Sequence, residues 1–163
     1  MMDERTQEEP RAWDLEGATH RAGFKIEELV EFVRAASPSE EDFGQALSQL
    51  HQALDKAADK VAKKTPAQQD LIGQVDALID TLYFTYGSFV LMGVDPERIF
   101  DIVHQANMGK IFPDGKAHFD PVTHKILKPD DWEAKYAPEP AIKKELQRQL
   151  KAYERHKASN NTQ

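Results

Sequence analysis

The 163-residue sequence predicts an all-α fold with four main helices, a small hairpin or loop, and a C-terminal helix. Apolar residues recur at three- and four-residue spacing along four long segments, which is the period of an amphipathic helix. Residues that favour helix starts separate these segments. Turn sequences are concentrated in residues 111–131, where the helical pattern changes.

The first two helices are placed by their flanking residues. Residues 1–18 form a polar N-terminal extension, and a helix is expected from about Thr19 to Ala36. Ser37-Pro38-Ser39-Glu40 is a candidate capping box with proline at the first helical position, and Thr65-Pro66-Ala67-Gln68 repeats the device. The helix between these boxes carries the apolar stripe Phe43, Leu47, Leu50, Leu54 and Val61.

The third and fourth helices follow the same logic. The third is expected to end near Met92-Gly93, and Asp95-Pro96 should cap the fourth. The apolar stripe of the third helix is Leu71, Val75, Leu78, Leu82 and Phe89, and that of the fourth is Ile99, Ile102, Val103 and Ala106.

The remainder of the chain changes character twice. Phe112-Pro113-Asp114-Gly115 and Asp120-Pro121-Val122-Thr123 are turn sequences between short extended pieces, which predicts a small hairpin or an ordered loop. An amphipathic helix should begin near Pro140. The domain is therefore expected to span residues 19–158, with a disordered tail at 159–163.

Composition narrows the function. The chain has 28 acidic and 21 basic residues and no cysteine, so a duplex nucleic-acid binder, disulfides and thiolate metal sites are not expected. No apolar run approaches about 18 residues and no secretory signal opens the chain, so a cytoplasmic protein without membrane contact is expected.

Five carboxylates form the main candidate site. On a helix, Glu27, Glu28 and Glu31 fall within one face, because Glu28 and Glu31 are separated by roughly 60° and Glu27 lies about 40° beyond Glu31. Asp76 and Asp80 are about 40° apart on the third helix. Like charges at this spacing cost about 0.2–0.5 kcal/mol, a cost that a bound cation would reverse.

The alternative is that these acids are solvated outer faces. Two features argue against it. Phe24 and Phe32 flank the acidic face of the first helix and Tyr83 flanks that of the third. Gly73 and Gly87 also lie beside the aspartates, where glycine weakens a helix unless another backbone or a ligand approaches closely.

At these residues the chain resembles the all-α nucleoside triphosphate pyrophosphohydrolases, the superfamily of MazG-like proteins, dimeric dUTPases and phosphoribosyl-ATP pyrophosphohydrolases. EELVE matches the EExxE motif, and DALIDTLYFTYGSFVLMGVDPERIFDIVHQANMGK is similar to the second metal helix and a third helix ending in HxAN and lysine. The resemblance covers about Thr19 to Trp132. It is closest to a bacterial subgroup sometimes labelled Cof-like HAD hydrolases, although no DxDx[TV] motif is present.

The resemblance implies a four-helix-bundle-type fold and a reaction in which an NTP and water give an NMP and pyrophosphate. It also implies a house-cleaning role for this reaction. It implies Mg²⁺, or alternatively Mn²⁺, held by Glu28, Glu31 and Asp80. The motif of the family's second helix is ExxD, and Ala77 occupies the glutamate position in this chain. Asp76 is the substitute ligand. It lies four residues before Asp80 instead of three, and its side chain is one methylene shorter than that of the family's glutamate.

The remaining site residues are also assigned through the resemblance. Glu27 would activate the water or support a metal ligand, Lys110 and Lys116 would contact phosphates, and Asn107 would contact the base or sugar. Lys110 could also simply favour a helix C-terminus, and Asn107 could be a helix cap. The resemblance further implies a homodimer or a dimer of dimers, which agrees with apolar residues outside the main stripes, namely Phe24, Phe32, Phe84, Tyr86 and Phe89.

Two other functions remain open at this stage. Asp101 and His104 form one approximate copy of the Glu-x-x-His motif that di-iron carboxylate bundles use twice, so a di-metal oxidoreductase is a weaker alternative. The alanine at position 77 also allows a non-catalytic helical interaction module with a degenerate metal site.

Overall fold

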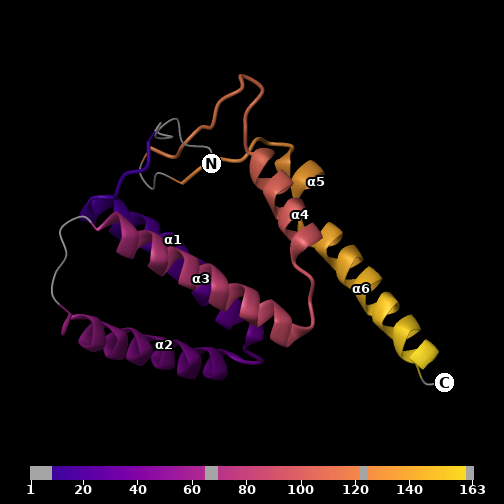
Figure 1. Ribbon diagram of the computed structural model, residues 1–163. Coiled ribbons are helices and arrows are strands. Elements are labelled where there is room, and N and C mark those ends of the chain that lie inside the picture. Colours follow the sequence, from indigo (N-terminus) through magenta and orange to yellow (C-terminus); the bar gives the residue numbers. More distant parts are fainter. Residues whose placement is uncertain (1–8, 65–69, 122–124, 161–163) are drawn as a thin grey trace. The chain divides into compact units, whose positions relative to one another are not determined.

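The computed structural model describes residues 9–64, 70–121 and 125–160. In these ranges the chain is helical, which confirms the predicted all-α fold (Figure 1). The helices are α1 (Leu15–Ala36), α2 (Glu40–Val61), α3 (Leu71–Met92), α4 (Glu97–Met108), α5 (Trp132–Tyr136) and α6 (Glu139–Asn160). None of them is long and apolar enough to cross a membrane.

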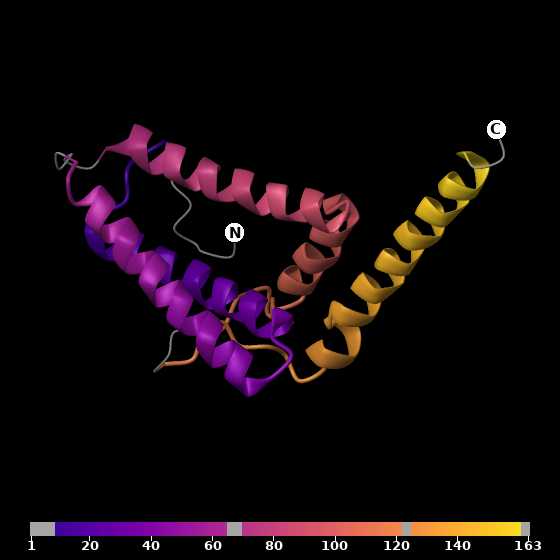
Figure 2. The same cartoon turned by 90° about the horizontal axis from the view of Figure 1, so that it is seen from below.

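The chain divides into two compact units, and the division falls inside α3 between Leu78 and Ile79. Residues 7–78 contain α1, α2 and the start of α3. Here α1 packs against α2, and the two run side by side in both views (Figure 1 and Figure 2). The N-terminal segment is tied to α3 because the Trp13 backbone exchanges two hydrogen bonds with the Gln74 side chain, at 2.9 and 3.1 Å.

Two predicted helix starts were misplaced. Helix α1 begins at Leu15, not near Thr19, because the Asp14 carboxylate accepts a hydrogen bond from the Gly17 backbone N–H. Ser39, not Ser37, caps α2 and accepts from the Asp42 N–H at 3.1 Å, while Ser37 still belongs to the end of α1. The second predicted box, at residues 65–68, lies outside the described residues.

The end of α3 and the start of α4 agree with prediction. Gly93 has a φ of 68°, a left-handed conformation in which glycine has no Cβ penalty. Val94 N–H then donates to the Phe89 carbonyl, which closes the last turn. Asp95 accepts from the Glu97 N–H at 3.1 Å and so satisfies a free donor at the start of α4.

The predicted hairpin or loop consists of two isolated antiparallel bridges, Ile111 with Ala117 and Phe119 with Ile126. The turn at residues 122–123 lies outside the described residues. Helix α6 begins at Glu139 and continues through Asn160, so Ser159 and Asn160 are helical and do not belong to a disordered tail. The polar extension likewise overlaps the first turn of α1.

In residues 79–160, helix α4 packs against α6 and a small core forms near the end of α4. Ala106 and Trp132 are the buried hydrophobic residues of the described chain, 4% and 6% exposed. Tyr136 packs directly on Gly109, where an added Cβ would lie 2.4 Å from the ring. Glu145 on α6 is also buried, and its carboxylate accepts two hydrogen bonds from Arg148 at 2.8 and 2.6 Å.

The apolar stripes predicted for α2 and α3 contain half-buried and exposed residues. Leu54 on α2 is 57% exposed and Leu82 on α3 is 54% exposed. No residue of α1, α2 or α3 is buried. The stripes of α2 and α3 therefore do not form a closed core within the described part of the chain, because an apolar helix face is buried only against a further surface.

Candidate metal centre

The three glutamates of the EELVE segment lie in the second half of α1. Glu27, Glu28 and Glu31 are exposed and fall on one side of an uninterrupted helix, as the periodicity predicts. The helix itself is well specified, because Asp14 caps its first turn and the Ser37 N–H donates to the Arg34 carbonyl at its end. All three side chains can therefore offer oxygen to a ligand outside the helix.

Asp76 and Asp80 lie one turn apart on α3 and are also exposed. Asp76 belongs to the unit of residues 7–78, which includes the three glutamates, whereas Asp80 belongs to the unit that begins at Ile79. Ala77, at the position where the family motif has glutamate, offers no ligand atom.

Among the residues that the structure describes, no group of three or more His, Asp or Glu side chains is arranged to hold a metal ion. The ligand assignment is therefore still a prediction. The donor chemistry nevertheless fits a hard cation, because all five predicted side chains are carboxylates and none offers nitrogen or sulfur. Mg²⁺ prefers oxygen ligands of this kind and is completed by water and substrate phosphates.

The glycines beside the aspartates do not mark a close contact in the single chain. An added Cβ at Gly87 would meet nothing within 4 Å, and at Gly73 it would meet the side chain of the neighbouring Asp70. Tyr83 on the same helix is 73% exposed. The close approach expected at Gly73 and Gly87 is therefore not made by the described part of this chain.

The structure brings two predicted substrate residues together at the end of α4. Lys110 Nζ donates to Asn107 Oδ1 at 2.8 Å, and Asn107 Nδ2 donates to the Val103 carbonyl at 3.1 Å. Gly109 occupies the cap position, so the asparagine is not the helix cap. The amide is instead held between its own helix and the lysine, with both groups half-buried.

Lys116 lies in the hairpin, and its backbone N–H donates to Asp114 Oδ1 at 3.0 Å. His118, for which the sequence suggested no partner, is 2.7 Å from the other oxygen of Asp114. The His118 hydrogen bond, helped by the Lys116 N–H, lowers the pKa of Asp114 below its ordinary value. The companion histidine at position 124 lies outside the described ranges.

The Asp101 and His104 pair shows no sign of a metal ligand set. The His104 ring stacks on Phe100, with the planes 6° apart and the centroids 6.3 Å apart. The contact with Phe100 gives the His104 ring a packing role within α4 itself.

Sequence reasoning missed the contacts made by Trp132. The indole Nε1–H donates to the Ala106 carbonyl at 2.8 Å, which fixes α5 to the HxAN segment 26 residues earlier. Lys128 Nζ lies 3.9 Å from the centre of the indole ring and Lys110 Nζ lies 5.9 Å from it. A tryptophan directly after a turn-rich segment was the only signal for this arrangement.

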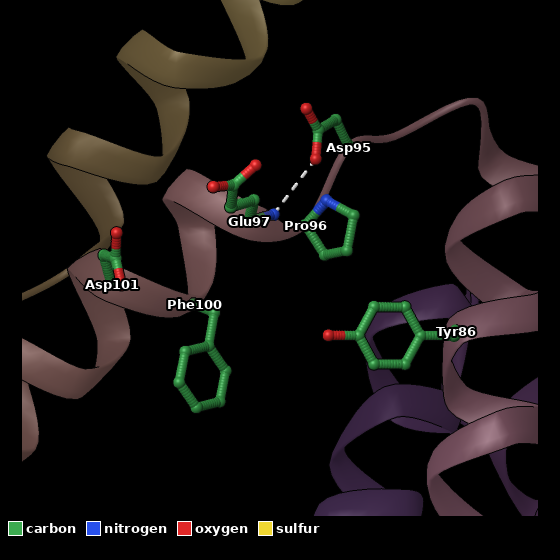
Figure 3. A pocket seen from close by; sticks show the side chains of 6 residues that line it. All are labelled: Tyr86, Asp95, Pro96, Glu97, Phe100 and Asp101. Carbon is green, nitrogen blue, oxygen red and sulfur yellow. Dashed lines mark hydrogen bonds between the residues drawn. The ribbon is translucent and has the colours of Figure 1, made fainter.

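An open depression of about 420 Å³ lies between the end of α3 and the start of α4. Figure 3 shows the Tyr86 ring directed from α3 toward α4, with Phe100 on α4 facing the same opening. Asp95, Pro96, Glu97 and Asp101 complete the lining. The depression contains none of the residues predicted to bind metal or substrate.

Residues 1–107 match the sequence model that defines the phosphoribosyl-ATP pyrophosphohydrolase family. The chain belongs to this family. The matched range contains both acidic segments and ends at Asn107, so the segment from Lys110 onward lies beyond it.

A solved structure extends the comparison to most of the chain. The crystal structure of a "putative NTP pyrophosphohydrolase" from Exiguobacterium sp. 255-15 is 40% identical in sequence and has a TM-score of 0.81. The match covers 91% of this chain and 88% of that one. No curated protein matches. Together the family and this similarity identify the chain as an all-α member of the NTP pyrophosphohydrolase superfamily.

Proposed function

We propose that this protein is a metal-dependent nucleoside triphosphate pyrophosphohydrolase, which converts an NTP and water to an NMP and pyrophosphate. The observation that carries the proposal is the coincidence of the family match with the EELVE segment and the two aspartates of α3. A house-cleaning role against unwanted nucleotides follows as part of this proposal.

The carboxylates of Glu28, Glu31, Asp76 and Asp80 would hold the metal. A bound Mg²⁺ or Mn²⁺ would supply Lewis-acid chemistry: it would polarise the α-phosphate, orient the pyrophosphate leaving group and lower the pKa of the attacking water. Glu27, adjacent to the ligands on α1, would accept a proton from that water or orient a ligand.

The chain's own cations and amide would bind the rest of the nucleotide. Lys110 and Lys116 would contact the phosphates, and ionised donors form the stronger hydrogen bonds to such oxygens. Asn107 would contact the base or sugar. Its amide is already oriented by the Val103 carbonyl and Lys110, so little side-chain freedom would be lost on binding.

We also propose that two copies of the chain associate. The support is the exposed apolar surface of α1 and α3, which includes Ile26, Phe32, Leu78 and Phe84 at 50, 55, 42 and 72% exposure. Exposed apolar side chains of this size, where they form a patch, usually mark an interface, and a pair with twofold symmetry is the commonest arrangement. Association through these helices would place the carboxylates close to the second copy.

The reaction is tested by product analysis. Purified protein is incubated with individual NTPs, dNTPs and damaged nucleotides in Mg²⁺ or Mn²⁺, and pyrophosphate and orthophosphate are measured separately. We expect pyrophosphate and the nucleoside monophosphate in equal amounts, and loss of turnover in EDTA. Orthophosphate as the initial product would refute the proposal, because it would mean cleavage at the terminal phosphate.

The same preparation separates the two weaker alternatives. A di-metal oxidoreductase would retain iron after purification, and an interaction module would show no turnover with any nucleotide and metal. Pyrophosphate release that depends on Mg²⁺ or Mn²⁺ excludes the second of these directly.

A further inference from the structure

Trp132 is a buried aromatic residue that is bonded to the last turn of α4. It is 6% exposed, and its indole N–H is fixed to the backbone carbonyl of Ala106. Ala106 and Asn107 are neighbours, so the plane of the indole is set relative to the amide proposed to contact the nucleotide. The ring is too buried to stack on a nucleobase, which requires an open face.

Two ammonium groups share this one ring. Lys128 Nζ lies 3.9 Å from the ring centre and Lys110 Nζ lies 5.9 Å from it, so their separation cannot exceed the sum of these two distances. A triphosphate can bridge such a span. The attraction of each cation to the ring compensates part of their mutual repulsion and holds both near the indole.

The carboxylates that follow Lys128 do not neutralise it. Asp131 is bound by Lys135 at 2.5 Å, and Asp130 forms no ion pair with Lys128 in the described structure. Lys128 is exposed, so its ammonium can meet a ligand from solvent while the side chain lies on the buried ring. Two cations held together without a partner carboxylate on Lys128 form a site suited to a polyphosphate anion.

We infer that Lys128 is a second phosphate-binding residue beside Lys110, and that Trp132 is a positioning residue that holds both ammonium groups toward the substrate. The inference rests on the proposed function, because the polyphosphate is taken to be the triphosphate of the nucleotide or the pyrophosphate released from it. It adds a residue beyond the family match, which ends at position 107.

The test measures binding of inorganic tripolyphosphate with Mg²⁺ by calorimetry, which requires no turnover. We expect Lys128→Ala to weaken binding by on the order of tenfold, the effect of losing one charge-assisted contact. Lys128→Arg should bind nearly as well as the wild type. Lys151→Ala is the matched control, since it removes an exposed lysine from α6 and should change nothing. Equal binding by Lys128→Ala and wild type, or an equal loss in Lys151→Ala, would overturn the inference.

The role of Trp132 is tested with Trp132→Phe, which keeps an aromatic ring and removes the N–H donor. We expect weaker tripolyphosphate binding and a higher KM for the nucleotide with kcat changed much less. Unchanged KM and tripolyphosphate affinity in a folded variant would show that the indole only packs. If the wild type releases no pyrophosphate from any nucleotide, the proposed function fails, whereas the calorimetry still decides whether Lys128 and Trp132 form a polyphosphate site.

Discussion

The regions on either side of the division in α3 are stabilised in different ways. In residues 79–160 a buried indole bonds α5 to α4, α4 packs against α6, and a bidentate ion pair within α6 satisfies the buried Glu145. In the described part of residues 7–78 the helices carry Glu27, Glu28, Glu31 and Asp76 but bury no side chain, while Asp80 belongs to the other unit. The region proposed to bind phosphate therefore has a small core of its own, and the region that carries most of the proposed metal ligands does not.

This difference has a physical consequence for the site. A carboxylate cluster is repulsive, so the helices that carry it need apolar burial or a cation to hold them in place. Because α1 and α3 expose apolar residues in the described part of the chain, we expect that stabilisation to come from a second copy and from bound metal. The predictions below ask whether metal and a second copy supply it.

The largest expected effect is on catalysis. Asp76→Asn keeps the size of the side chain and removes its charge, so we expect turnover to fall by at least about a thousandfold if Asp76 replaces the family's glutamate. Ala77→Ser is the control, because it changes the motif position without supplying a carboxylate. Loss of activity in Ala77→Ser with activity retained in Asp76→Asn would reverse the assignment.

The second effect is on assembly. Light scattering should give twice the mass of the 18.5 kDa chain at micromolar concentration. Leu82→Asp places a charge on the exposed stripe of α3 and should shift the protein toward monomer with loss of activity, because burying an unpaired charge is costly. Leu82→Met conserves volume and should remain dimeric. A wild-type protein that is monomeric and active would contradict the proposal that two copies must associate for activity.

The third effect is on thermal stability. A cation that binds only the folded state stabilises it by about 2.7 kcal/mol at a concentration one hundred times its Kd. For a domain of this size we expect the Tm to rise by roughly 5–10 °C in Mg²⁺ or Mn²⁺. Glu28→Gln and Asp80→Asn should abolish that rise. A Tm that does not respond to either metal in the wild type would count against the centre.

The sequence predicted local features well where a single residue decides them. Gly93 ends α3 because the left-handed turn favours glycine, and the acidic faces of α1 and α3 follow directly from helical period. The start of α1 was misplaced because the Asp14 cap lies before the apolar pattern becomes regular. Ser37 and Ser39 both resemble caps, and only the structure shows that the first remains bonded to the Val33 carbonyl of α1.

Long-range contacts could not be predicted in the same way. Nothing local to Trp132 indicates that its N–H bonds to Ala106, because that contact depends on the path of the intervening loop. Whether the five carboxylates converge is also a non-local question, so helical period predicts which face of each helix they share but not what that face meets. The apolar stripes illustrate the same limit, since periodicity predicts burial without identifying the surface that provides it.

The smallest expected effect is a pH dependence confined to the α4–α6 region. The hydrogen bonds from Arg148, then the one from Gln149, lower the pKa of Glu145 from 4.5 to about 2. A depressed carboxyl pKa stabilises the fold above the unfolded value, and this contribution is lost as the pH falls through the folded value. The contribution of Glu145 should therefore be complete at neutral pH and disappear between about pH 4.5 and 2.

Glu145→Gln tests this, because it keeps the side-chain shape and removes the titrating group. The variant should be less stable than the wild type at pH 7, and the difference in unfolding free energy should shrink as the pH is lowered from 4.5 toward 2. Asp114→Asn is a useful comparison, since its pKa is lowered by a partner in the exposed hairpin where solvent screens the pair. If the difference in unfolding free energy between the wild type and Glu145→Gln does not change with pH, the charge of the Glu145–Arg148 pair does not stabilise the fold and only the packing of the side chain matters. The stability of the α4–α6 region would then depend on Trp132 and its neighbours.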